Sequence, residues 1–484
     1  MLDKIKQQIE RIKGLGATYV DTRWYPFEEA NYLLMWNGNL KSATSARESG
    51  VGIRVLYKGA WGFSASSDLS DLAALFDKAF DNARVAAERV TFPVRLAEKD
   101  AIQAKFESPC AINPFDVPLA DKVAFLKDMD EQLNQEGVFQ RVCDLAFVRK
   151  QIVFVDSEGS QIEKLITEVF STMQVSGLDD QGATYERTFR PPRSGDSRGW
   201  ETIDKKLFSE NAERIVKEMN QVRAADECPK EDRSVILLPN IMYLQTHETI
   251  GHALELDRIL GYELAFAGGS FVTLDDFGKL RYGSPRLTAR ADATLPNSPG
   301  SFGYDDDGVP AQNTLLIDKG ILVGAITGRQ MVEEANAKAK RQIFKGSGGA
   351  NRATSFYRVP IERMTNINID PGQDGSLEDI VRNTEKGIVM DSERSWSIGS
   401  NREQFHFGTE IGWLVEDGKI TKVVKNPTYK GATVKFWNSL SAVGDQSTWQ
   451  VKYVDNCGKG QPNQSMQLGH GVPVCRFDNV RIGE

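Results

Sequence analysis

Residues 235–257 read VILLPNIMYLQTHETIGHALELD, and the interpretation of the whole chain starts from this stretch. The apolar run at residues 235–238 is typical of a strand, and Pro239 lies where a helix can begin. His247 and His252 follow, and they are two of the four histidines in the 484-residue chain. We therefore predict a strand and then a helix that carries both histidines about two turns from its start.

The segment from His247 to His252 holds the residue types of a hydrolytic zinc site. Its two imidazoles are suitable zinc ligands, and the carboxylate of Glu248 is a suitable general base for activating water. Zinc protease motifs usually place the two histidines four residues apart, whereas here they are five residues apart. The alternative interpretation is that these are two unrelated histidines on a packed helix.

The separation of five residues has a consequence for the helix. Side chains five positions apart on a straight α-helix point about 140° away from each other, whereas side chains four apart differ by about 40°. A single π-type turn would bring both rings back to one side, and Gly251 lies where such a distortion costs least. We therefore predict a widened or broken turn between Glu248 and His252.

A catalytic zinc also requires a third protein ligand and an open position for water. The residues alone leave several candidates, which are the cysteines, His406, His470, Glu255 and Asp257. Among them Cys457 stands out, because it lies in the glycine-rich stretch DNCGKGQ at residues 455–461, where we expect a loop with an exposed thiol. We expect Lys459, two residues further on, to favour the thiolate form.

The composition argues against several classes of protein. The net charge is -8, from 59 Lys and Arg against 67 Asp and Glu, and no basic block is present, so we expect no nucleic-acid partner. No run approaches the ~18–20 apolar residues of a membrane helix, and the N-terminus lacks the apolar run of a signal peptide, so we expect no membrane partner. Five cysteines are too few for a disulfide framework in this chain, which favours a reducing cytoplasm.

Periodic runs divide the chain into three expected units. Residues 1–100 are interpreted as an α+β domain with an amphipathic first helix, and residues 101–228 as a second α+β domain with a long hairpin between helices. Residues 229–484 are expected to form a β-rich C-terminal catalytic domain, because many short alternating runs end at Gly turns. The predicted fold class is α+β, with an N-terminal α/β region and a β-rich C-terminal domain that carries the zinc-motif helix.

The segment from His247 to Asp257 and the stretch around Cys457 resemble the TldD/TldE (PmbA) family of metalloproteases. The same resemblance extends to four other stretches, at residues 50–55, 59–63, 306–310 and 363–366. The catalytic TldD-type subunit of that family has the same spacing of the two histidines, and its TldE partner lacks the motif. The resemblance covers most of the chain and is weakest between residues 100 and 225.

The resemblance implies a ligand set, an assembly and a substrate class. It implies that His247, His252 and Cys457 bind Zn²⁺ and that Glu248 is the catalytic base. It also implies a two-subunit particle that encloses a protected active site, formed with a TldE-like partner or with a second copy of this chain. Family substrates are unfolded peptides, including a microcin leader and a labile antitoxin, and members are also described as modulators of DNA gyrase.

We therefore predict a cytoplasmic zinc metallopeptidase that cleaves unfolded peptides or leader peptides. Glu255 and Asp257 are expected to accept hydrogen bonds from the ligand imidazoles, and the alternative for them is a surface position or a salt bridge to Arg258. His470 is expected to contact the substrate or an oxyanion.

The main alternative is a non-catalytic regulatory subunit, a modulator of DNA gyrase or of a toxin–antitoxin system, with a structural metal. A structural zinc normally has four protein ligands, so three candidate ligands and a base favour catalysis. A thiol enzyme that uses Cys457 and His470 is the weaker alternative, because it leaves the pair of histidines unexplained.

Overall fold

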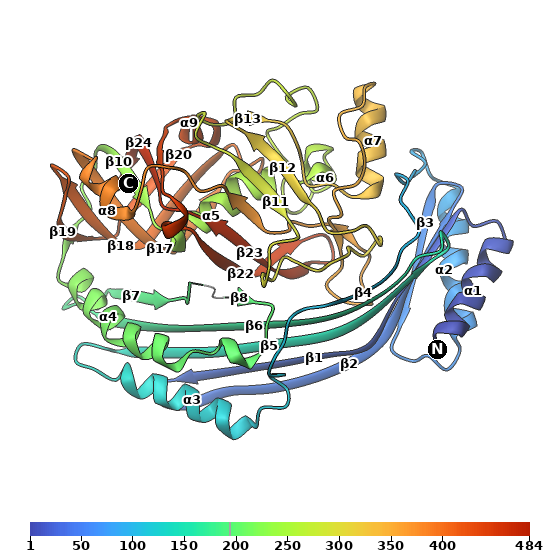
Figure 1. Ribbon diagram of the computed structural model, residues 1–484, viewed down its shortest axis with the longest axis horizontal. Helices are drawn as coiled ribbons and strands as arrows, with labels where there is room; N and C mark the ends of the chain where they lie inside the picture. The colour runs from blue at the N-terminus through green and yellow to red at the C-terminus, as the bar shows by residue number, and fades with distance from the viewer. Residues whose placement is uncertain (193–194) are drawn as a thin grey trace.

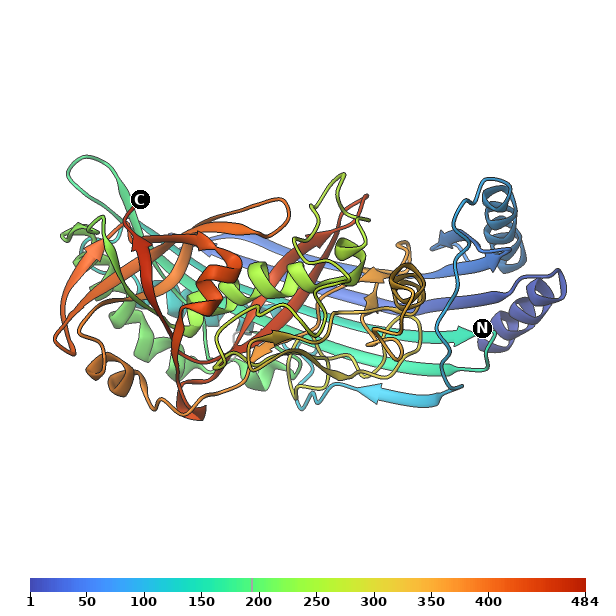
Figure 2. The same cartoon turned by 90° about the horizontal axis from the view of Figure 1, so that it is seen from above.

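Long strands from the first part of the chain form a curved sheet along one side of the molecule (Figure 1). The computed structural model describes residues 1–192 and 195–484. The C-terminal half, coloured green to red from β10 onward, lies against one face of this sheet, and helices cover parts of the other face (Figures 1 and 2). This mixture of helices and strands confirms the predicted α+β class with a β-rich C-terminal region.

The N-terminal sheet has eight strands within the described residues. They are β1 (Tyr19–Trp36), β2 (Asn39–Tyr57), β3 (Ala60–Ser66), β4 (Gln103–Glu107), β5 (Gln140–Asp156), β6 (Gln161–Leu178), β7 (Thr184–Phe189) and β8 (Gly195–Asp196). Six of them run in the order β3-β2-β1-β5-β6-β4, and β7 and β8 both pair with β6. The expected units 1–100 and 101–228 therefore share one sheet, because β1 pairs antiparallel with β5 along most of its length.

Alternation along β5 explains why this sheet is covered on both faces. Cys143, Leu145 and Phe147 point to the face that packs against α3 and α4, and Val153 and Val155 point to the same face further along, against α1 and α2. The intervening side chains therefore point toward the C-terminal half. The helices are α1 (Leu2–Gly14), α2 (Leu72–Ala87), α3 (Leu119–Gln132) and α4 (Lys205–Arg223). Among the described residues, no helix combines the length and apolar character needed to cross a membrane.

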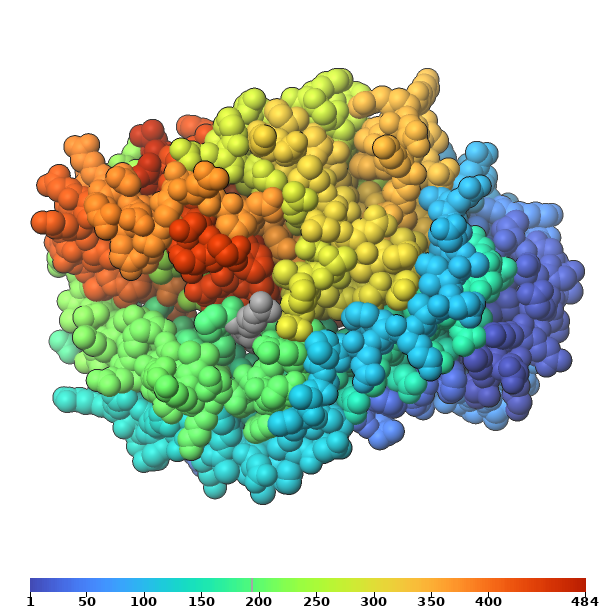
Figure 3. Space-filling view, in the orientation of Figure 1, coloured from blue at the N-terminus to red at the C-terminus, as the bar shows by residue number. Residues whose placement is uncertain are grey.

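Buried ion pairs join the sheet to the C-terminal half. Lys164 of β6 pairs with Asp306 at 2.9 Å, and Arg54 of β2 pairs with Asp307 at 2.6 Å. Burial opposes ionisation of Asp306, but Lys164 and Arg23 outweigh it and lower the pKa of Asp306 to about 2. The space-filling view shows the two halves in contact along most of the molecule (Figure 3).

The C-terminal half contains a second eight-stranded sheet in the order β17-β10-β24-β20-β18-β19-β9, with β21 paired to β24. A four-stranded sheet, β13-β12-β11-β16, and the hairpins β14-β15 and β22-β23 complete it. The strands are β9 (Asp226–Glu227), β10 (Asp232–Leu237), β11 (Ala289–Asp292), β12 (Asn313–Asp318), β13 (Ile321–Leu322), β14 (Asn351–Arg352), β15 (Ile361–Glu362), β16 (Ile367–Ile369), β17 (Lys386–Ile398), β18 (Gln404–Glu416), β19 (Lys419–Lys425), β20 (Thr428–Ala432), β21 (Leu440–Val443), β22 (Gln450–Lys459), β23 (Gln464–Val472) and β24 (Cys475–Ile482).

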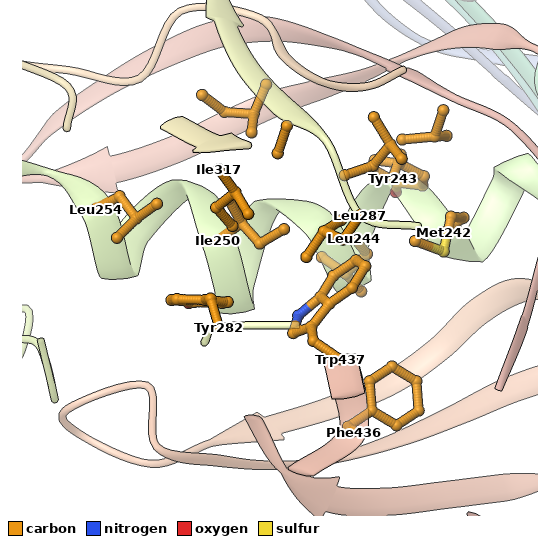
Figure 4. Packing of buried hydrophobic residues seen from close by; sticks show 14 of the residues in the cluster. Met242, Tyr243, Leu244, Ile250, Leu254, Tyr282, Leu287, Ile317, Phe436 and Trp437 are labelled. Carbon is orange, nitrogen blue, oxygen red and sulfur yellow. The ribbon is translucent and has the colours of Figure 1, made fainter. Parts of the chain in front are cut away.

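Helix α5 runs through the main core of this half. The helices here are α5 (Pro239–Thr246), α6 (Leu256–Ile259), α7 (Arg329–Ala339), α8 (Leu377–Arg382) and α9 (Thr433–Asn438). Trp437 of α9 packs below α5 and the turn that follows it, close to Leu244 and Ile250 (Figure 4). The Trp437 ring is fully buried, and its Nε1 donates a hydrogen bond to Thr249 Oγ1 at 2.9 Å. The core thus directly supports the histidine segment.

We expect Trp437→Ala to destabilise the protein by about 3–5 kcal/mol, because it leaves a large cavity and removes the donor to Thr249. Scanning calorimetry of the metal-free protein should show a clear drop in the thermal midpoint. The control is Trp396→Ala, whose ring is 56% exposed and whose loss should cost no more than about 0.5 kcal/mol. Equal midpoints for the two variants would contradict this account of the core.

Candidate metal centre

The two histidines lie on a distorted helix, as their spacing predicts. After α5, residues His247–Gly251 form a π-helical turn, and residues His252–Leu254 form a 3₁₀ turn. This confirms the predicted widened turn. A Cβ atom at Gly251 would collide with the sulfur of Met364, so glycine also allows the turn to pack closely. The rings of His247 and His252 consequently lie together, with centroids 4.7 Å apart.

Cys457 joins the two histidines in a buried cluster. One ligand atom from each of His247, His252 and Cys457 lies within 4.8 Å of the others. Cys457 Sγ is 3.6 Å from His252 Nε2. Among the described residues, no other His, Cys, Asp or Glu belongs to this group. The three side chains that the sequence singles out are thus within reach of a single metal ion.

Cys457 does not lie in an exposed loop, and that expectation is wrong. It lies on β22, opposite Met466 of β23, and only 4% of its surface is exposed. The pairing shifts register between Val454 and Cys457, so a bulge re-aims the strand immediately before the thiol. The glycines after Cys457 give this strand the composition of a loop, and the bulge interrupts its alternating pattern. The sequence therefore favoured an exposed loop where the structure has a buried strand.

The cluster is electrostatically prepared for a cation. Burial lowers the pKa of His247 to about 4, so this ring is neutral near pH 7, and burial also lowers the pKa of His252. Burial opposes ionisation of Cys457, but His252 and Arg363 outweigh it and lower the pKa of the thiol. Arg363 also donates hydrogen bonds to the carbonyl oxygens of Cys457 and Gln464, which fixes the hairpin.

Glu255 holds the ring of His252. His252 Nδ1 donates to Glu255 Oε2 at 2.9 Å, which leaves Nε2 facing Cys457. Arg258 Nε and Lys459 Nζ lie 2.6 Å and 3.2 Å from the same carboxylate. Burial opposes ionisation of Glu255, but Lys459 and Arg258 outweigh it and hold its pKa well below the usual range.

Asp257 does not contact a ligand imidazole, contrary to our expectation, but binds Lys459. Its Oδ1 accepts a hydrogen bond from Lys459 Nζ at 2.7 Å, so it supports the lysine rather than an imidazole. Lys459 Nζ also donates to the carbonyl of Glu362 at 2.7 Å. Lys459 is therefore committed to buried carboxylates and a carbonyl, and the charges that favour the thiolate of Cys457 come from His252 and Arg363.

His470 lies behind His247 rather than at the mouth of the site. It belongs to β23 and is fully buried. His470 Nε2 lies 2.8 Å from His247 Nδ1, and the backbone N–H of Ile367 donates to His470 Nδ1 at 2.9 Å. Both ring nitrogens of His470 are thus engaged, so the ring is placed to orient His247 and not to contact an oxyanion. His406 is an exposed residue of β18 and takes no part in the cluster.

Glu248 and the three candidate ligands face a cavity of about 820 Å³. The sheet supplies one wall, with Tyr32, Asp144 and Thr172, whose positions on the inward face follow from the alternation described above. The C-terminal half supplies the other wall, including Trp396 of β17 and Phe266 of the segment after α6. Glu248 is partly exposed, which leaves its carboxylate accessible from the cavity.

Sequence reasoning did not assign a role to Arg363 or to Lys459 as a carboxylate partner. These side chains act on residues that are neighbours in space but not in the sequence: Arg363 contacts Cys457 across 94 positions, and Lys459 contacts Asp257 across 202. The one signal available was the placement of Arg363 and Lys459 within stretches that carry the family resemblance.

The cluster, the adjacent carboxylate and the large cavity together are typical of a metallopeptidase. The family model described as PmbA/TldA metallopeptidase C-terminal domain matches residues 230–484, and the model of domain 1 of that family matches residues 28–83. The chain belongs to the PmbA/TldD family of metallopeptidases.

Individual relatives agree with this assignment. A metalloprotease of Methanocaldococcus jannaschii is 29% identical over 96% of this chain and 97% of its own length. A TldD homologue of Haemophilus influenzae, also a metalloprotease by name, is 32% identical over 49% of this chain and 45% of its own. The fold is similar to that of a proposed modulator of a DNA gyrase from Thermotoga maritima, with a TM-score of 0.76, 15% identity and full coverage of both chains. It is also similar to TldE from Thermococcus kodakarensis, with a TM-score of 0.71, 16% identity and 99% coverage of both chains.

We expect His470→Ala to weaken zinc affinity by about 10–100-fold, because the ring of His247 loses the hydrogen bond that orients it. Competition with a chromogenic chelator measures the affinity, and the variant should still bind zinc at saturation. The matched control is His406→Ala, which removes an exposed histidine remote from the cluster. Identical affinities in the two variants would show that His470 does not support the site.

The depressed pKa of His247, about 4, also predicts the pH dependence of metal binding. Zinc affinity should fall as pH falls, because protons compete for the ligands. Between pH 7 and 6 the imidazole of His247 stays neutral, and the lowered pKa of His252 limits the uptake of protons there. Most of the fall should therefore come from one thiol, whose share is at most about tenfold. Two imidazoles with ordinary pKa values near 6.5 would add about another tenfold. A chelator titration at both pH values that gave a hundredfold loss would contradict the prediction.

Proposed function

We propose that this chain is a zinc-dependent peptidase of the TldD type that cleaves unfolded peptides or leader peptides. The observation that carries the proposal is the convergence of His247, His252 and Cys457 beside Glu248 at one cavity wall. Two imidazoles and a thiolate are a donor set that suits zinc, and three protein ligands leave a fourth position free. The lowered pKa values of the ligands support the same metal.

Each residue of the cluster has a proposed task. His247, His252 and Cys457 would hold the ion, which supplies Lewis acidity that lowers the pKa of a water and polarises the scissile carbonyl. Glu248 would take the proton from the attacking water and later give it to the leaving amine. Glu255 and His470 would keep the two imidazoles in position.

The size of the cavity supports an extended peptide as substrate. A volume of about 820 Å³ holds several residues of an unfolded chain but not a folded domain. Its walls come from both halves of the molecule, so a peptide must lie between the curved sheet and the zinc-motif turn.

We further propose that the protein acts in the cytoplasm with a partner of the same fold. The five cysteines in the structure are free, which supports a reducing compartment. The likeness to a TldE structure supports assembly with a TldE-like subunit or with a second copy of this chain.

The test compares three kinds of variant for zinc content and for cleavage of a casein-like unfolded peptide. Glu248→Gln should keep one zinc per chain and lose at least about 100-fold in turnover, because the base is removed and the ligands remain. His252→Ala and Cys457→Ser should lose both zinc and turnover. Glu385→Gln, at an exposed glutamate outside the cavity, is the matched control and should behave as wild type.

Two results would count against the proposal. Full turnover in Glu248→Gln would remove Glu248 from its role as base. Absence of zinc from protein never exposed to a chelator, together with absence of cleavage, would favour the regulatory subunit instead.

A further inference from the structure

Arg402 is an unusual cation in the wall of the same cavity. It lies in the turn between β17 and β18, and only 8% of its surface is exposed. Its backbone adopts a φ of 66°, a left-handed conformation that residues other than glycine rarely take. Such a conformation is strained and persists only where the surroundings enforce it. The surroundings here include Thr433, whose hydroxyl donates to the carbonyl of Arg402 at 2.5 Å.

The guanidinium of Arg402 forms no ion pair with any described residue, although Glu248 and Glu255 are close enough for their charges to act on it. Its Nη2 donates to the carbonyl of Ala267 at 2.9 Å and its Nη1 to the carbonyl of Gly399 at 3.3 Å, while its Nε is buried and has no hydrogen-bond partner. Within the described part of the chain, no carboxylate oxygen lies within the 4.0 Å limit of an ion pair with Arg402. A buried charge without a partner is costly, so a bound anion would offset a real penalty.

The other arginines of this cavity wall differ in that respect. Arg190 pairs with Glu393 at 2.6 Å, and Arg394 lies 3.9 Å from Glu186. Among the arginines that line the cavity, Arg402 is thus the one without a carboxylate partner in an ion pair. Glu248 and Cys457 lie close enough for their charges to act on it. It lies at the same cavity as the candidate base and ligands, where the substrate of the proposed peptidase must bind.

We propose that Arg402 binds an anionic oxygen of the peptide in this cavity, an inference that rests on the proposed function. Two sources share this chemistry. One is the C-terminal carboxylate of a peptide. The other is the oxyanion that forms when water adds to the scissile carbonyl: the new C–O bond forms, the carbonyl electron pair moves to oxygen, and Glu248 takes the proton.

Calorimetry tests the inference without turnover when every zinc-loaded protein, reference and variant alike, also carries Glu248→Gln. The probes are an amidated, acetylated peptide, the same peptide with a free C-terminal carboxylate, and an amidated phosphinate analogue that carries an anionic tetrahedral centre. Arg402→Gly should weaken at least one anionic probe by about 10–100-fold and leave the neutral amide unchanged. Loss confined to the free carboxylate identifies the C-terminus as the ligand, and loss with the phosphinate identifies the oxyanion.

Two further variants separate binding from structure. Glycine suits a φ of 66°, so Arg402→Gly should fold, and a few millimolar guanidinium should restore part of the lost affinity. Arg402→Lys keeps the charge without the planar fork and should show an intermediate loss. Asp417→Gly, at another left-handed residue beyond the far end of β18, is the matched control and should bind all probes as the reference does.

The outcomes distinguish this inference from the proposed function. Binding of the probes that is indifferent to Arg402→Gly would overturn the role of Arg402 and leave the peptidase in place. Equal weakening of the neutral and anionic probes would also overturn it, because that pattern indicates a general loss of structure. A zinc-loaded reference protein that binds none of the probes would overturn both.

Discussion

Two imidazoles five positions apart point in divergent directions on a regular α-helix, so a shared metal site here depends on one extra residue in one helical turn. The π turn at His247–Gly251 supplies it, at a cost in backbone hydrogen bonding that the surroundings must offset. Trp437 donates to the Thr249 hydroxyl, and Tyr282 donates to the Thr249 carbonyl. The geometry of the cluster therefore depends on how the β-rich half packs around this turn, because a looser core would let the helix return to its regular pitch.

The rest of the cluster is brought in by the β22–β23 hairpin. Cys457 and His470 lie on its two strands, and each contacts a different histidine of the turn. The hairpin is fixed in turn by Arg363 and by Lys459, which reaches the carboxylates of Glu255 and Asp257. Lys459 and the two carboxylates compensate one another's charges, so removing one of them would leave a buried charge unpaired and shift the ligand it supports.

The sequence allowed the local features to be predicted and left the long-range ones open. The helix after residue 238, the widened turn and the hairpins at residues 315–323 and 413–420 follow from spacing and turn residues that lie within one short stretch. The pairing of β1 with β5 and the contact of His470 with His247 join positions more than 100 residues apart, and no local pattern encodes them. The expectation of an exposed loop at Cys457 was wrong for another reason. The strand is bulged just before Cys457 and has glycines just after it, so its composition is that of a loop.

The cavity exists because the two halves meet through charged side chains as well as apolar ones. Arg187 of β7 reaches Asp391 and Glu410 of the C-terminal half at 2.8 and 2.9 Å, next to the cavity wall. Buried ion pairs add little net stability compared with apolar packing, but their geometry is demanding. An apolar interface would tolerate sliding of one half over the other, whereas an arginine shared between two carboxylates does not. The polar side chains on the inward face of the sheet, which are Tyr32, Asp144 and Thr172, are thereby held at a fixed position across from the turn at His247–Gly251. A peptide that lies between the two walls requires this fixed spacing.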